Sequence, residues 1–119
     1  MALEIEWLVG GRVCLVIAPH IIDAEALQNH DIAMLHWLDK TEERVYVIVD
    51  VSAMKQVTSL KQAFSLKHIR HPRMTHIFTV GLSLNPMARF VIPMAAYVSG
   101  VHYKDFATRE DALKHITDV

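Results

Sequence analysis

The sequence predicts a single α/β domain over residues 1–119, an α/β sandwich whose helices pack around a mixed, largely parallel sheet. The stretch RVYVIVDV, residues 44–51, is too continuously apolar for a half-exposed strand, which indicates a central strand covered on both faces. Strand-like and helix-like segments alternate after it, which favours parallel strands joined by helices. A glycine pair near the N-terminus adds a β-hairpin, so the expected order is ββαβαβαβα with about four helices.

The opening hairpin is predicted from two apolar runs that flank the glycine pair. Apolar side chains alternate with more polar ones over residues 3–9, and a second run covers residues 13–17. Between them, Gly10 and Gly11 supply the positive φ angles of a tight turn. The two runs are therefore expected to pair as antiparallel strands.

A first helix is expected to begin after Asp23, because its carboxylate can accept hydrogen bonds from the free amides of a first turn. Apolar side chains then recur at helical spacing, and His30 and Asp31 interrupt this stripe. The apolar positions are Leu27, Met34, Leu35 and Leu38.

A second helix is expected to follow the central strand and to stop before Pro72, because a residue that precedes proline avoids helical angles. One face of this helix carries Leu60, Ala63, Phe64 and Lys67. The chain then continues with a strand, THIFTVGLS, over residues 75–83. After a third helix come a short edge strand, HYKDF, and a last helix that begins at Thr108 and carries Ala112, Leu113 and Ile116.

The third helix has clear bounds and an unusual composition. Asn85 followed by Pro86 is typical of a helix start, and Gly100 is typical of an end. Residues 89–99 contain almost no polar side chain in their interior, whereas an ordinary surface helix carries a polar face. Because Pro93 removes one helical hydrogen bond, we expect a bend there.

Composition and charge exclude several classes of protein. Hydrophobic residues make up 52% of the chain and the formal net charge is −1, so neither a disordered chain nor an electrostatic nucleic-acid binder is indicated. Cys14 is the single cysteine, which excludes an internal disulfide and fits a reducing, cytoplasmic setting. The N-terminal stretch carries acids where a signal peptide needs basic residues. No apolar run approaches the ~20 residues of a transmembrane segment.

The element order, the strand that ends in DVSAM and the helix after it resemble the STAS domain, in its SpoIIAA-like (STAS/SEC14-type) branch, over essentially the whole chain. In the related anti-sigma-factor antagonists the central strand ends in an Asp-hydrophobic-Ser-Gly loop. There an Asp-Ser-Ser-Gly motif opens the second helix, and a partner kinase phosphorylates its second serine. Residues 50–53 occupy the first motif, with Ala53 at its glycine position, and residues 58–61 occupy the second. The acceptor position is therefore Leu60, which cannot be phosphorylated.

Two interpretations of TSLKQ, residues 58–62, stay open. Ser59 with Gln62 three positions later forms a capping box, and such caps contribute ~1 kcal/mol, so we favour a helix cap. A phosphate on Ser59 or Thr58 would also be stabilised by the helix N-terminus, so a phosphorylation switch at Ser59 is the second hypothesis.

Asp50 also has two interpretations. It follows the central strand, where ligands bind in open α/β sheets, and it can equally accept hydrogen bonds from loop amides. With no base or metal ligand nearby in sequence, the structural role is favoured. Because loops at the carboxyl ends of parallel strands gather at one rim, a polar border is expected there. Its members are Asp50, Ser52, Thr58, Ser59, Ser83 and Asn85.

The stretch KHIRHPRMTH suggests a metal site at first sight. His68 and His71 can share a helix face, and His76 follows beyond the proline. Zinc needs three or four converging ligands, and neither a cysteine nor a nearby acid completes this set. The favoured interpretation is a basic helix end whose histidines and arginines face solvent. We expect no metal and no cofactor.

Three function classes remain. The first, which the resemblance to STAS domains implies, is a non-catalytic regulatory module that acts by protein association through the third helix and the loop 50–59, as a homodimer or with a regulatory protein. The second is a carrier or sensor of a hydrophobic small molecule or lipid. The third is an enzyme, which we do not expect because no nucleophile or phosphate-loop motif is present. The candidate binding residues are Asp50, Ser52, Met54, Thr58, Ser59, Met87, Phe90, Met94 and Tyr97.

Overall fold

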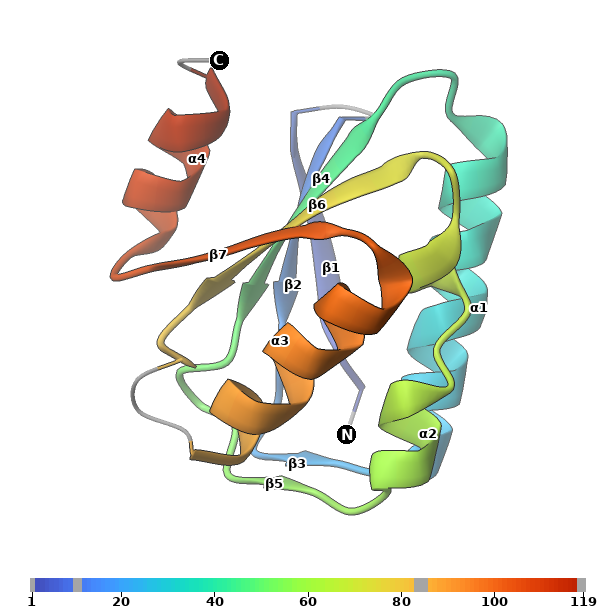
Figure 1. Ribbon diagram of the computed structural model, residues 1–119, viewed down its shortest axis with the longest axis vertical. Coiled ribbons are helices and arrows are strands. Elements are labelled where there is room, and N and C mark those ends of the chain that lie inside the picture. Colours follow the sequence, from blue (N-terminus) through green and yellow to red (C-terminus); the bar gives the residue numbers. More distant parts are fainter. Residues whose placement is uncertain (1, 10–11, 83–85, 118–119) are drawn as a thin grey trace.

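A five-stranded sheet lies at the centre of the structure, a computed structural model that describes residues 2–9, 12–82 and 86–117 (Figure 1). The strand order is β1-β2-β4-β6-β7. β1 is antiparallel to β2, and each other neighbouring pair is parallel. The strands are β1 (Glu4–Val9), β2 (Val13–Ile17), β4 (Val45–Asp50), β6 (Met74–Val80) and β7 (His102–Phe106).

The helices cover the two faces of this sheet unequally. Three helices, α1, α2 and α3, lie on one face, and α4 lies on the other (Figure 1). Their bounds are α1 (Ala24–Lys40), α2 (Leu60–Phe64), α3 (Pro86–Ser99) and α4 (Arg109–Thr117). The predicted order of strands and helices is confirmed, and β4 is the central strand as expected.

Two short strands that the sequence did not indicate, β3 (Ile21–Ile22) and β5 (Gln56–Val57), pair in parallel beyond the carboxyl ends of the main strands (Figure 1). The amide of Thr58 donates to the carbonyl of Ile22 at 2.9 Å. This pairing attaches the loop after β4 to the segment after β2. A run of two residues carries no periodic signal, so only the folded chain reveals it.

The second helix is shorter than predicted. It ends at Phe64, and a separate 3-10 turn, η1 (His68–Arg70), precedes β6. The reason is that the amides of Lys67 and His68, which would donate along a continuing helix, donate instead to the carboxylate of Asp31 at 2.9 and 2.8 Å. Of the predicted apolar face only Ala63 is buried, whereas Leu60 and Phe64 are exposed.

The bounds of α3 agree with the prediction where the structure describes them. The helix begins at Pro86, contains Pro93, and is followed by Gly100 with φ of +73°, a conformation that favours glycine at a helix end. Asn85, Ser83 and the Gly10–Gly11 turn lie outside the described residues. Every helix in the described part of the chain is too short or too polar to cross a membrane.

Candidate functional site

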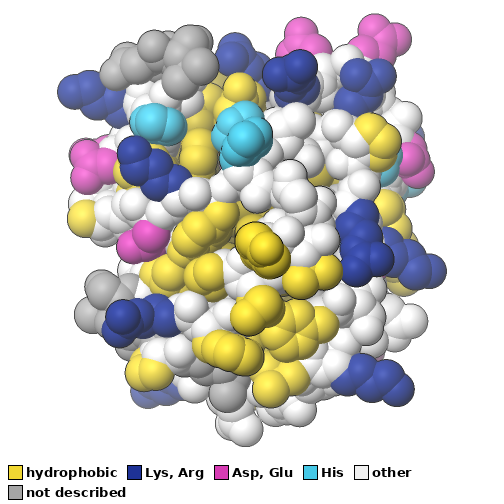
Figure 2. Space-filling view, viewed as in Figure 1, with side chains coloured by type: hydrophobic (Ala, Val, Ile, Leu, Met, Phe, Trp, Pro, Cys, Tyr) yellow, Lys and Arg dark blue, Asp and Glu magenta, His cyan; other side chains and the backbone are white. Residues whose placement is uncertain are grey.

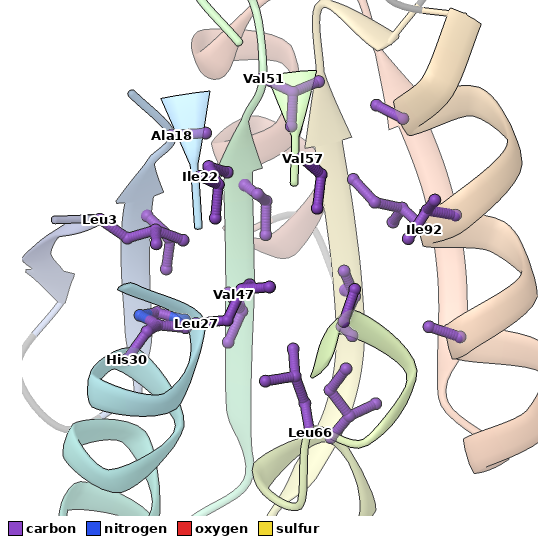
Figure 3. Close-up of a pocket in the computed structure, with 18 of the residues that line it drawn as sticks. Leu3, Ala18, Ile22, Leu27, His30, Val47, Val51, Val57, Leu66 and Ile92 are labelled. Atoms are coloured by element: carbon purple, nitrogen blue, oxygen red, sulfur yellow. The ribbon is translucent and has the colours of Figure 1, made fainter. Parts of the chain in front are cut away.

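An apolar pocket lies between the sheet and the helices that cover its α1 face (Figure 3). Its volume is about 120 Å³. The space stays unfilled in part because Ala63 of α2 and Ala88 and Ala95 of α3 contribute only methyl groups to its lining. Larger aliphatic side chains from the sheet, α1 and α3 surround it, among them Val16, Val47, Ile77, Leu27, Val91 and Ile92.

Two buried histidines give this pocket a polar end. His30 of α1 and His68 of η1 both line it, and their rings form a T-shaped contact with centroids 5.1 Å apart. Asp31 Oδ1 lies 2.6 Å from Nδ1 of His68. The same carboxylate accepts hydrogen bonds from the amides of Lys67 and His68, in the segment that follows α2. Asp31 therefore orients the His68 ring at the pocket. Nδ1 of His30 is buried and has no hydrogen-bond partner within the described structure.

The pKa values follow from this geometry. Burial, followed by the nearby His68, lowers the pKa of His30 to about 3, although Asp31 acts in the opposite direction. Burial alone would raise the pKa of Asp31, but hydrogen bonds from His68 and from the Lys67 amide outweigh it and hold that pKa at about 2. At neutral pH Asp31 is therefore ionised and His30 is neutral. Because an ionised carboxylate can only accept a hydrogen bond, Nδ1 of His68 carries the proton in its hydrogen bond with Asp31.

Sequence reasoning did not identify this polar cluster. The only signal was that His30 and Asp31 interrupt the apolar stripe of α1, at positions that the structure places on the buried face. A polar pair on a buried helix face needs partners, and that requirement could have pointed to a site. The expectation that His68 faces solvent is wrong, because its partner Asp31 draws it into the core, where it is 5% exposed.

The other two histidines of the stretch KHIRHPRMTH contact different residues from those around His68. His71 Nε2 lies 2.9 Å from Asp39 Oδ1. His76 stacks between Tyr46 and His102, with centroid distances of 4.6 and 4.9 Å, on the α4 side of the sheet. Each ring thus has a different set of neighbours.

Asp50 joins the central strand to the helix on the opposite face. Its Oδ1 accepts from the Ser52 amide at 2.9 Å, and its Oδ2 accepts from Nε of Arg109 at 2.6 Å. Burial would raise the pKa of Asp50, but these hydrogen bonds and the charge of Arg109 outweigh it, so the pKa lies below its ordinary value. Both carboxylate oxygens thus have partners within the fold.

The remaining predicted residues of the loop after β4 do not form one site, because their side chains lie in different surroundings. Ser52 is exposed at the surface and packs against Gly81, where a Cβ would overlap its Oγ. Met54 is 7% exposed and lines the apolar pocket. Thr58 is exposed, and Ser59 accepts a hydrogen bond from the Gln62 amide at 3.2 Å, which makes it the N-cap of α2.

The predicted residues of α3 form an exposed apolar patch, which Figure 2 shows as hydrophobic side chains gathered over this helix. Phe90, Met94, Tyr97 and Val98 share one side of the helix by their spacing, and Tyr97 is 85% exposed. We call these four residues the α3 surface. Met87 lies in the first turn of α3, and its side chain is outside the described part of the structure. The opposite side of α3 lines the pocket, so one helix serves both features.

The chain is similar to the crystal structure of an uncharacterized protein from the DUF3478 family with a SpoIIAA-like fold, from Shewanella loihica PV-4. The TM-score is 0.69 at 12% sequence identity, and the match covers 95% of this chain and 90% of that chain. At this identity the likeness shows the fold, so the predicted SpoIIAA-like fold is confirmed. No protein-family model and no curated protein matches the sequence.

Replacing the cap of α2 should cost stability. We expect Ser59→Ala to lower the free energy of unfolding by roughly 0.5–2 kcal/mol, and Ser59→Asp to retain most of it, because aspartate also caps. Thr58→Ala is the matched control and should change stability by less than about 0.5 kcal/mol. Urea unfolding measures all three. A Ser59→Ala protein of unchanged stability would contradict the cap.

The neutral state of His30 should make stability depend on pH. Between its ordinary pKa of 6.5 and its folded value of about 3, the unfolded chain binds a proton that the folded chain does not. The free energy of unfolding should therefore fall as pH is lowered from about 7 to about 5, with a slope approaching about 1.4 kcal/mol per pH unit from this group.

The measurement is urea unfolding at each pH for the wild type and for His30→Phe, which should lose much of that slope. His36→Phe removes an exposed histidine of the same helix and should keep the slope. Equal slopes in the wild type and His30→Phe would show that His30 is not the responsible group.

Proposed function

We propose that this SpoIIAA-like domain is a non-catalytic binding module for a small hydrophobic molecule, acting as a carrier or sensor. The apolar pocket supports the proposal, since protein interiors hold few voids larger than a water molecule. At about 24 cal/mol per Å³, an empty space of this volume corresponds to roughly 3 kcal/mol of lost stability. Apolar cavities of about 150 Å³ bind benzene, so a compact apolar ligand matches the volume.

The chemistry of the lining favours binding over turnover. Among the described lining residues, His30 and His68 are the two whose side chains carry nitrogen or oxygen. The single thiol, Cys14, lies outside the lining, and burial raises its pKa to about 12, so it is no thiolate nucleophile at neutral pH. Asp50 is held by Arg109 and the Ser52 amide. We therefore propose that the pocket binds its ligand without converting it.

A second candidate function, association with a second copy or with a regulatory protein, is supported by the α3 surface. Contiguous exposed apolar side chains usually mark interaction sites. The two candidates are compatible, because α3 lines the pocket on one side and carries this surface on the other.

Filling the pocket should block ligand uptake. We expect Ala95→Leu, which adds a larger side chain to the lining, to weaken benzene binding by at least about tenfold relative to the wild type. Tyr97→Ser is the matched control on the same helix, because Tyr97 is exposed and lies outside the lining. Titration by NMR measures binding, and native mass spectrometry of freshly purified protein detects a retained ligand. Absence of benzene binding in the wild type would contradict the proposal.

Placing a charge on the α3 surface should disrupt self-association. We expect the wild type to have a dimer mass at micromolar concentration and Phe90→Glu to have a monomer mass. Ile32→Glu is the matched control, because Ile32 on α1 is 60% exposed and Phe90 is 58% exposed. Light scattering measures the mass. A monomer mass for the wild type, or equal losses in both variants, would contradict association through α3.

A further inference from the structure

His30 introduces a buried polar atom without a partner into an otherwise aliphatic pocket. Its side chain is 8% exposed, and Nδ1 makes no hydrogen bond within the described structure. Figure 3 shows the His30 ring on the α1 side of the pocket. Most buried polar groups in native proteins have a partner, so an unsatisfied nitrogen that lines a pocket indicates a missing one.

We infer that the pocket binds a small neutral molecule with one hydroxyl group on a compact apolar body, and that the hydroxyl pairs with Nδ1 of His30. This inference rests on the proposed binding function and adds the chemical class of the ligand. A hydroxyl both donates and accepts, so it can satisfy Nδ1 in either tautomer of the ring.

His68 lies at the same end of the pocket. Its Nδ1 is held by Asp31, and its ring also lines the pocket. Because the two imidazoles touch edge to face, the hydrogen-bonding capacity of the pocket lining is concentrated at one end. The rest of the lining suits a hydrocarbon body, and the volume of about 120 Å³ suits one about the size of a single aromatic ring.

The charges around this end favour a neutral group over a carboxylate. Burial holds the pKa of His30 at about 3, so its ring is uncharged at neutral pH. Asp31, the acid that acts on His30 here, is ionised and already accepts hydrogen bonds from three donor groups of Lys67 and His68. A buried anion beside this carboxylate would lack compensating charge from His30, which is costly in an apolar site.

Matched probes separate these alternatives. Phenol, toluene and benzoate share one ring and differ in the polar group, and each is titrated into the wild type, His30→Phe and the exposed control His36→Phe. We expect the wild type and His36→Phe to bind phenol about tenfold more tightly than toluene and to bind benzoate most weakly. His30→Phe should still bind toluene and lose the preference for phenol.

The outcomes distinguish this inference from the function on which it rests. If toluene binds and phenol shows no advantage in the wild type, or if His30→Phe keeps that advantage, the hydroxyl assignment is wrong and the apolar pocket stands. If no probe binds the wild type, both are wrong. Should His30→Phe fail to fold, the ring-nitrogen NMR resonances of wild-type His30 decide. A shift of Nδ1 with phenol but not with toluene supports the pairing, and its absence overturns it.

Discussion

The carboxylate of Asp31 determines the arrangement of the pocket side of this fold. It accepts hydrogen bonds from the amides of Lys67 and His68 and from Nδ1–H of His68, and so joins the middle of α1 to the segment after α2. An ionised carboxylate that makes several hydrogen bonds to the backbone keeps its charge even when it is partly buried, which explains the pKa of about 2. The early end of α2, the turn η1 and the inward position of His68 all depend on this one group.

The pocket follows from the same arrangement. The helix α2 has five residues, and its Ala63 contributes only a methyl group to the pocket lining beside α1 and α3. His30 borders this pocket with a nitrogen that no described group satisfies.

The opposite face of the sheet has a different organisation. There α4 covers β4, β6 and β7, and the ion pair between Arg109 and Asp50 attaches its first residue to the end of the central strand. Asp50 lies at the carboxyl end of the central strand, where ligands bind in open α/β sheets, but it shares only this position with a ligand-binding acid. Its oxygens are engaged in holding α4, whereas the pocket lies on the other face and depends on a different aspartate.

Features that depend on neighbouring residues are predictable from the amino-acid order alone. The apolar run of β4, the span of α3 from Pro86 to the residue before Gly100, and the Ser59 cap were all predictable, because strand burial, proline and glycine geometry and capping act within a few positions. Contacts between distant segments form only in the folded chain. Asp31 and His68 are 37 positions apart and Asp50 and Arg109 are 59 apart, and neither pair has a local signature. The pocket, the burial of Met54 and the unpaired nitrogen of His30 depend on how several elements pack at once, which no local pattern encodes.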